Sequence, residues 1–250
     1  MRFSPALRDL NWLVARPIAH RGLQHNKATE NTEAAFAAAI EKDYAIECDL
    51  QLTADNEAVV FHDDTVDHLL DGSGPVKSFT TKQIKNMTFK SGTSRVQTFA
   101  ELLEQIDGRS TLVIELKTLW DKNVTLAKRA LDVLQHYNGP HALMSYDPLL
   151  IKYVAVDNPS TTRGIVGERS ASDTYKTLPL SHSLKLRQMS HLAETKPHFI
   201  SYYFRDLPYK PVALFRAKGN PVITFTIRNP QQAAYAHRYC DQVTFQDYYE

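Results

Sequence analysis

IAHRGLQHNKATENTEAAFAAAIEKDYAIECDLQLTADNEAVVFHD, residues 18–63, is the stretch that decides the fold of this chain. It contains three short apolar segments, at 18–19, 45–50 and 58–61, and an alanine-rich run typical of a helix separates the first two. Polar side chains lie in or directly after these segments. They are His20, Arg21, Glu47, Asp49 and His62. A parallel sheet would bring these side chains together at the carboxyl ends of its strands.

Local signals define the turns between these segments. Gly22 can adopt a positive φ without strain, so a tight turn can follow the first strand. Asn31 and Thr32 can cap the helix that follows. The turn-like residues 53–56 join the second and third apolar segments as a hairpin, which directs His62 back toward the acids.

Two carboxylates share one face of the second strand. Glu47 and Asp49 are two residues apart, and side chains in a strand alternate between its faces. Two buried acids at this spacing repel each other and lose solvation unless a cation compensates them. Oxygen ligands suit Mg²⁺ or Ca²⁺, which leaves the two histidines free for proton transfer. The spacing therefore indicates a site for a divalent cation.

A third strand repeats this arrangement. Glu115 and Lys117 are two residues apart at the end of the apolar run 112–114, so they also share a face. A third carboxylate therefore joins the first two. Arg21 and Lys117 bring two positive charges to the same strand ends.

The motifs along the chain resemble the glycerophosphodiester phosphodiesterase family. The matching motifs are HRG at 20–22, ENT at 30–32, ExD at 47–49, HD at 62–63 and ELK at 115–117. The resemblance implies metal-dependent hydrolysis of a glycerophosphodiester to sn-glycerol 3-phosphate and an alcohol, through a cyclic phosphate. The metal ligands would be Glu47, Asp49 and Glu115, the acid–base pair His20 and His62, and the phosphate-binding residues Arg21 and Lys117. Which histidine is the base stays open.

Strands and helices alternate regularly after residue 98. Together with the strands at 18 and 45, strands expected at 111–117, 141–146, 161–167, 198–204, 221–227 and 241–247 make eight. Eight alternating strands with short connections predict a (β/α)₈ barrel, an α/β fold that commonly has this length as one domain. We therefore expect 1–250 to be a single catalytic domain with a long helical region at 173–194.

Two segments lie outside this alternation. Residues 4–14 are predicted to form an opening helix, capped by Ser4, that either closes the bottom of the barrel or takes the place of a final helix in the outer ring. Residues 64–97 form an insertion after the hairpin, with a short helix at 80–86. Such a segment overhangs the active face of a barrel, so we expect a small lid that selects the leaving alcohol.

Composition limits the partners. The chain has 29 Lys and Arg against 28 Asp and Glu, a formal charge of +1, which gives no reason to expect a nucleic-acid or anionic-membrane partner. The apolar residues 10–15 are interrupted by Asn11 and resemble neither a signal peptide nor a membrane span, so we expect a cytoplasmic protein without stable membrane insertion. Cys48 and Cys240 are expected to be reduced packing residues. The expected partner is a small glycerophosphodiester; the oligomeric state stays open.

Two other functions share these motifs. A lyase resembling the sphingomyelinase D group would stop at a cyclic product, although such proteins are typically secreted and disulfide-bonded. A barrel that binds a phosphodiester without cleaving it would be a binding module, which the complete set of seven site residues disfavours. The chain also departs from the family where Phe225 replaces a frequent tryptophan and where the sequence FQD, residues 245–247, replaces a TD-containing ending.

Overall fold

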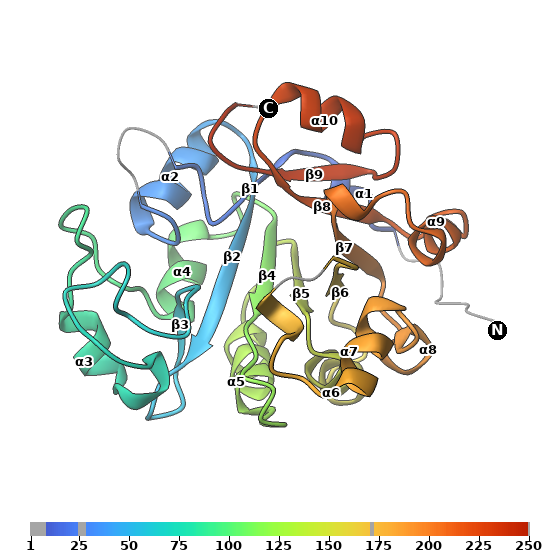
Figure 1. Ribbon diagram of the computed structural model, residues 1–250. Helices are drawn as coiled ribbons and strands as arrows, with labels where there is room; N and C mark the ends of the chain where they lie inside the picture. The colour runs from blue at the N-terminus through green and yellow to red at the C-terminus, as the bar shows by residue number, and fades with distance from the viewer. Residues whose placement is uncertain (1–8, 25–28, 171–172, 250) are drawn as a thin grey trace.

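The computed structural model describes residues 9–24, 29–170 and 173–249. Within these residues, eight parallel strands close into a barrel, because β1 pairs with both β2 and β9 (Figure 1). The barrel strands are β1 (Ile18–Ala19), β2 (Ala45–Leu52), β4 (Leu112–Leu116), β5 (His141–Ser145), β6 (Arg163–Gly167), β7 (Phe199–Tyr203), β8 (Val222–Ile227) and β9 (Gln242–Phe245). The predicted (β/α)₈ barrel is confirmed.

The hairpin after β2 is also present. β3 (Ala58–Val60) runs antiparallel to the end of β2, with Leu50 opposite Val60. The connection reverses at Asn56, whose φ is +62°, a conformation that asparagine tolerates better than most residues. β3 thus lies outside the barrel and leads directly to His62.

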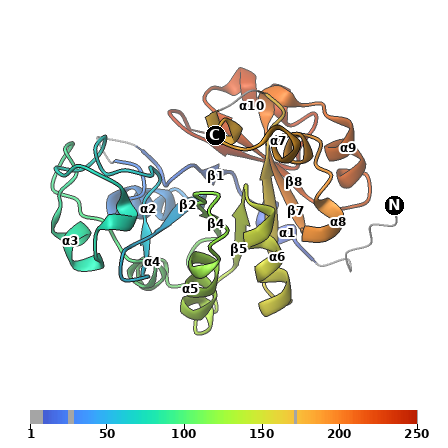
Figure 2. The ribbon, with the colours of Figure 1, turned by 60° about the horizontal axis from the view of Figure 1, so that its bottom comes forward.

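Helices surround the barrel, as Figures 1 and 2 show from two directions. Their bounds are α1 (Asn11–Val14), α2 (Glu33–Glu41), α3 (Thr81–Asn86), α4 (Phe99–Ile106), α5 (Thr125–Leu134), α6 (Pro148–Asp157), α7 (Leu180–Arg187), α8 (Leu192–Thr195), α9 (Lys210–Arg216) and α10 (Pro230–Ala236). Side chains cap many of them. In α4, for example, Thr98 and Glu101 form a reciprocal capping box that satisfies two backbone N–H groups at the start of the helix.

The helical region expected at 173–194 is divided into three pieces. A 3₁₀ turn, η2 (Asp173–Tyr175), precedes α7 and α8. Pro179 stands at the N-cap of α7, where its missing N–H costs nothing, and Met189 has a φ of +55°, which ends the helical path before α8. These two backbone positions explain why one continuous helix does not form.

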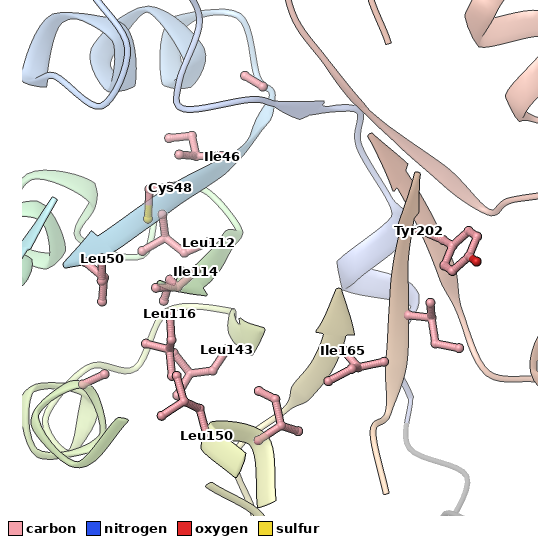
Figure 3. Close-up of a cluster of buried hydrophobic side chains, with 14 of the residues drawn as sticks. Ile46, Cys48, Leu50, Leu112, Ile114, Leu116, Leu143, Leu150, Ile165 and Tyr202 are labelled. Carbon is pink, nitrogen blue, oxygen red and sulfur yellow. The ribbon is translucent and has the colours of Figure 1, made fainter. Parts of the chain in front are cut away.

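Alternation of side chains separates two cores. Outward-facing residues of the strands pack under the helices; Figure 3 shows Ile46, Cys48 and Leu50 of β2 on this side. Inward-facing residues such as Val113 and Ala142 fill the barrel, where Leu10 and Leu13 at the N-terminus join them. The expected closure of the barrel by the opening helix is confirmed for α1, while Ser4 and the first part of that prediction lie outside the described residues.

The insertion at 64–97 shares a small core with Val59 and Phe61 of the hairpin, and this core is separate from the two cores of the barrel. Val66, Leu70, Ile84 and Phe89 are buried together, and short bridges hold its loops. α3 and these loops lie at the flank of the barrel, beside α2 and α4 (Figures 1 and 2). The role of this segment as a lid stays a prediction.

The remaining sequence predictions concern the membrane and the cysteines. Among the described helices, none is both long enough and apolar enough to cross a bilayer. Cys48 and Cys240 are buried and free, as expected for packing residues.

Candidate active site

Three carboxylates converge inside the carboxyl end of the barrel. Glu47 and Asp49 come from β2 and Glu115 from the neighbouring β4, where Asp49 and Glu115 are paired in register. One oxygen from each lies within 4.8 Å of the others. The side chains are almost fully enclosed, with Glu47 2%, Asp49 1% and Glu115 9% exposed. The structure therefore brings together all three predicted metal ligands.

Two cations lie against this cluster. Lys117 Nζ is 2.9 Å from Glu115 Oε1 and 3.6 Å from Asp49 Oδ1. Arg21 Nε is 3.3 Å from Asp49 Oδ2, while its Nη1 donates to Glu30 Oε1 at 2.7 Å. Both predicted phosphate-binding residues are thus at the site, and Glu30 of the ENT motif orients one of them.

The two acids of β2, Glu47 and Asp49, have different electrostatic surroundings. Burial raises the pKa of Glu47 well above its ordinary value, and the charges of Asp49 and Glu115 raise it further. Burial alone would also raise the pKa of Asp49, but the charge of Lys117, with smaller effects from other neighbours, lowers it below the usual range. The cluster is therefore short of positive charge, and the deficit falls on Glu47.

Asn31 forms two hydrogen bonds with Asp49, which its sequence position did not indicate. Its Nδ2 donates to Asp49 Oδ2 at 3.0 Å, and its Oδ1 accepts from the Asp49 backbone N–H at 3.3 Å. The helix α2 is capped by Thr32 alone, which accepts from Ala35 N. The prediction that Asn31 caps this helix is wrong, because its side chain turns into the site instead.

The two histidines flank the acids with different partners. His20 Nδ1 lies 2.8 Å from Gln246 Oε1, and its Nε2 is 3.9 Å from Glu47 Oε2. His62 Nδ1 lies 2.7 Å from Asp63 Oδ1. Burial, helped by the Arg21 charge, lowers the pKa of His20 to about 3. His20 is therefore a neutral imidazole at physiological pH in the metal-free protein.

A cavity of about 640 Å³ opens beside the cluster. Its lining includes the site residues His62, Glu115 and Lys117, together with Trp120 and Tyr146. The Glu168 carboxylate, buried after β6, and Glu115 add to the effect of burial in raising the pKa of Tyr146. The Tyr146 hydroxyl thus stays protonated and can donate a hydrogen bond into a space large enough for a small diester.

Gln246 and Tyr146 are further site residues that the motifs did not indicate. Gln246 stands in the segment where the chain departs from the family pattern, and that departure was the only available signal. Phe225 packs among the inward-facing residues of the barrel with its ring 6.3 Å from that of Tyr146, which agrees with an apolar wall at this position. Tyr202 is fully buried in the outer core.

The carboxylate cluster fits a hard divalent cation. All its donors are oxygens, the ligand type that Mg²⁺ and Ca²⁺ prefer. Among the described residues, Arg21 and Lys117 are the permanent positive charges in contact with the three carboxylates, so one negative charge is unbalanced. Burial raises the pKa of Glu47, and this imbalance adds to its effect.

Comparison with known proteins agrees with this geometry. The model of the glycerophosphoryl diester phosphodiesterase family matches residues 20–245. A glycerophosphodiester phosphodiesterase of Caldanaerobacter subterraneus is 38% identical over 129 residues, which are 48% of this chain and 53% of that protein. Glycerophosphodiester phosphodiesterase 1 of Bos taurus is 45% identical over 71 residues, which are 28% of this chain and 21% of that protein. The matching stretches thus span about half or less of these relatives.

The fold is similar to that of a solved phosphodiesterase of Oleispira antarctica in complex with the product sn-glycerol-3-phosphate. The TM-score is 0.79 at 21% identity, and the superposition covers 94% of this chain and 95% of that chain. This likeness supports the barrel, and the family model extends over most of the chain, including all seven predicted site residues. The chain therefore belongs to the glycerophosphoryl diester phosphodiesterase family.

Proposed function

We propose that this protein hydrolyses glycerophosphodiesters to sn-glycerol 3-phosphate and an alcohol. The observation that carries the proposal is the convergence of three carboxylates, two cations and two hydrogen-bonded histidines, of which His62, Glu115 and Lys117 line one cavity. Each group has a task in phosphodiester cleavage, and the cavity is of a size suited to a small ligand.

The metal ligands in this proposal are Glu47, Asp49 and Glu115. Bound Mg²⁺ or Ca²⁺ would supply Lewis-acid stabilisation of the charge on the phosphoryl oxygens. The buried positions of the three carboxylates on adjacent strands fix the donors before the ion arrives, which reduces the cost of ordering them.

The cations and the histidines act on the diester itself. Arg21 and Lys117 are placed to hold the phosphate oxygens and to balance their charge. One histidine accepts the proton of the glycerol 2-hydroxyl as its oxygen attacks phosphorus, and the other protonates the departing alcohol. Water then opens the cyclic phosphate. Each positioned proton transfer contributes roughly 10² to 10⁴ in rate.

The insertion is proposed to influence the choice of leaving alcohol. Asp64 and Thr65, its first two residues, line the same cavity as His62. A leaving group that extends past His62 would therefore meet the insertion, whereas the metal ligands lie on β2 and β4. This placement supports a selector at the entrance and not a role in binding the ion.

Turnover of glycerophosphocholine tests the proposal. With added Mg²⁺ or Ca²⁺ we expect release of choline and sn-glycerol 3-phosphate, and an excess of chelator should abolish it. Release of choline with a cyclic phosphate as the final product would indicate a lyase resembling the sphingomyelinase D group. Binding of the diester without cleavage under any metal would indicate a binding module.

A further inference from the structure

Gln246 is placed beside His20 by the closure of the barrel. β1 and β9 are paired in register at Ala19 and Phe245, and the next residue on each strand is His20 and Gln246. The His20 backbone N–H donates to Phe245 O at 2.9 Å, which fixes the two side chains as neighbours at the carboxyl end of the barrel. The contact between His20 Nδ1 and Gln246 Oε1 is 2.8 Å long.

Two charged neighbours determine which end of the Gln246 amide faces His20. Arg228 Nη2 donates to Gln246 Oε1 at 3.3 Å, so this atom must be the acceptor oxygen. Gln246 Nε2 donates to Asp247 Oδ1 at 3.3 Å, and a carboxylate can only accept here. Arg228 and Asp247 also form an ion pair with each other. Rotating the amide by half a turn would place its oxygen against Asp247 and its NH₂ group against the guanidinium, which is unfavourable on both sides.

The orientation of the amide fixes the tautomer of His20. An amide oxygen cannot donate, so the hydrogen bond requires the proton on His20 Nδ1. The neutral imidazole then carries its lone pair on Nε2. That nitrogen is the one on the carboxylate side, 3.9 Å from Glu47 Oε2. His20 therefore presents a proton acceptor toward the reacting groups.

His62 has the opposite kind of partner. Its Nδ1 lies 2.7 Å from the Asp63 carboxylate, a charged acceptor, whereas the partner of His20 is a neutral amide. The proposed function needs one base and one acid. With His20 as the base, the acid is His62.

We propose that Gln246 is a positioning residue for His20: its amide oxygen holds the imidazole in the Nδ1–H tautomer, so that Nε2 accepts the proton of the attacking hydroxyl. This rests on the proposed function. In the first step the glycerol 2-oxygen forms its bond to phosphorus, and its proton passes to His20 Nε2. The bond from phosphorus to the alcohol oxygen breaks, and that oxygen receives a proton from His62 Nε2. When water opens the ring, its proton passes to His62 and His20 returns its proton to the 2-oxygen, so both histidines are restored.

The proposal is tested by Gln246→Leu, which removes the acceptor at similar volume, and by Gln246→Glu, which keeps an acceptor oxygen. The tautomer of His20 is read from the ¹⁵N chemical shifts of its ring nitrogens at pH 8. We expect Nδ1–H in the wild type and in Gln246→Glu, and a large share of Nε2–H in Gln246→Leu. The value of kcat for glycerophosphocholine should fall about 10- to 100-fold in Gln246→Leu, with little change in KM. In Gln246→Glu, kcat should be close to the wild-type value.

Gln232→Leu is the matched control. Gln232 Oε1 accepts from the Arg228 backbone N–H, so this variant also removes an amide next to Arg228 but does not involve His20. We expect a wild-type tautomer, kcat and melting temperature. An Nε2–H tautomer in the wild type, or an unchanged kcat in folded Gln246→Leu, would overturn the proposal. If the wild type cleaves no diester, the proposed function fails, while the ¹⁵N measurement still decides whether Gln246 sets the tautomer.

Discussion

Glu47 and Asp49 are two residues apart on one strand, yet their carboxylates have different partners. Asp49 lies against Arg21 and Lys117 and accepts from Asn31. Glu47 accepts from the Arg21 backbone N–H, and its other neighbours are the two acids and the neutral His20. The opposite directions of their pKa shifts follow from this. The same substitution of amide for acid should therefore have opposite effects at the two positions.

We expect Glu47→Gln to stabilise the metal-free protein at pH 8 and Asp49→Asn to destabilise it. A carboxylate with a raised pKa in the folded state is penalised when it ionises, so the wild type loses stability as the pH rises from about 4.5 through the raised value. Glu47→Gln removes this loss. Asp49→Asn removes one carboxylate partner of Arg21 and Lys117, which keep Glu30 and Glu115, at a cost of about 1–3 kcal/mol.

Urea unfolding in the presence of chelator at pH 5 and pH 8 measures these effects. The gain from Glu47→Gln should be larger at pH 8 than at pH 5. The loss from Asp49→Asn should be present at both, because the lowered pKa of Asp49 keeps it ionised throughout this interval. Equal effects of the two substitutions would contradict the asymmetry. Both variants should bind the metal more weakly.

Substrates with different leaving groups distinguish the roles of the two histidines. A p-nitrophenyl ester of glycerol 3-phosphate has a leaving group that needs little protonation. With His20 as base and His62 as acid, His62→Ala should lose far less activity on this ester than on glycerophosphocholine. His20→Ala should lose activity on both. Steady-state rates on the two substrates check this, and the reverse pattern would exchange the roles.

A diester without a vicinal hydroxyl is the control for the route itself. Bis(p-nitrophenyl) phosphate offers no internal nucleophile, so the large effective molarity of intramolecular attack is absent. Slow cleavage by every variant is expected. Efficient turnover by the wild type would instead favour direct attack by water.

At the scale of elements, the proposed metal ligands and the residues proposed to surround the leaving group belong to different parts of the chain. β2 and β4 supply the carboxylates, and the hairpin through β3 supplies His62 and continues into the insertion. The small core of the insertion also contains Val59 of β3 and Phe61, so the insertion is packed against the hairpin that carries His62.

Shortening the loop DGSGPVKS, residues 71–78, should change the preference among leaving alcohols while the metal affinity stays nearly constant. We expect this change because the loop belongs to the insertion, whose first two residues, Asp64 and Thr65, line the cavity. The preference is measured as relative kcat/KM for choline, ethanolamine and glycerol diesters. The metal affinity is measured by calorimetry. An unchanged ranking in a folded variant would count against a selecting role.

At the scale of the whole molecule, the ion and the barrel should stabilise each other. The ligands come from two strands that are paired in the folded state only, so an ion that binds them favours folding. The melting temperature should rise with added Mg²⁺ or Ca²⁺ and return on chelation. At a concentration 100 times the dissociation constant the gain is about 2.7 kcal/mol. Glu115→Gln should reduce the rise in melting temperature on addition of metal. A melting temperature that does not change with metal would contradict the stabilisation expected here.

The sequence by itself determined the barrel and most of its site. Period-two spacing placed Glu47 with Asp49 and Glu115 with Lys117, because alternation along a strand is a local property of the backbone. The succession of eight strands and their helices predicted the closed parallel sheet, because strands joined through helices run parallel and eight of them can close. The prediction of one helical region at 173–194 was less successful, since local breaks at Pro179 and Met189 divide it.

Only the tertiary structure decided how the site is supported and polarised. His20 and Gln246 are 226 residues apart and meet because β1 closes on β9, which no local pattern reports. The Asn31 side chain donates to the buried Asp49 carboxylate and does not cap the helix that it precedes. Capping propensity alone does not indicate this contact. Sequence patterns specify which face of an element a residue occupies, whereas hydrogen bonds between distant elements depend on how the barrel brings those faces together.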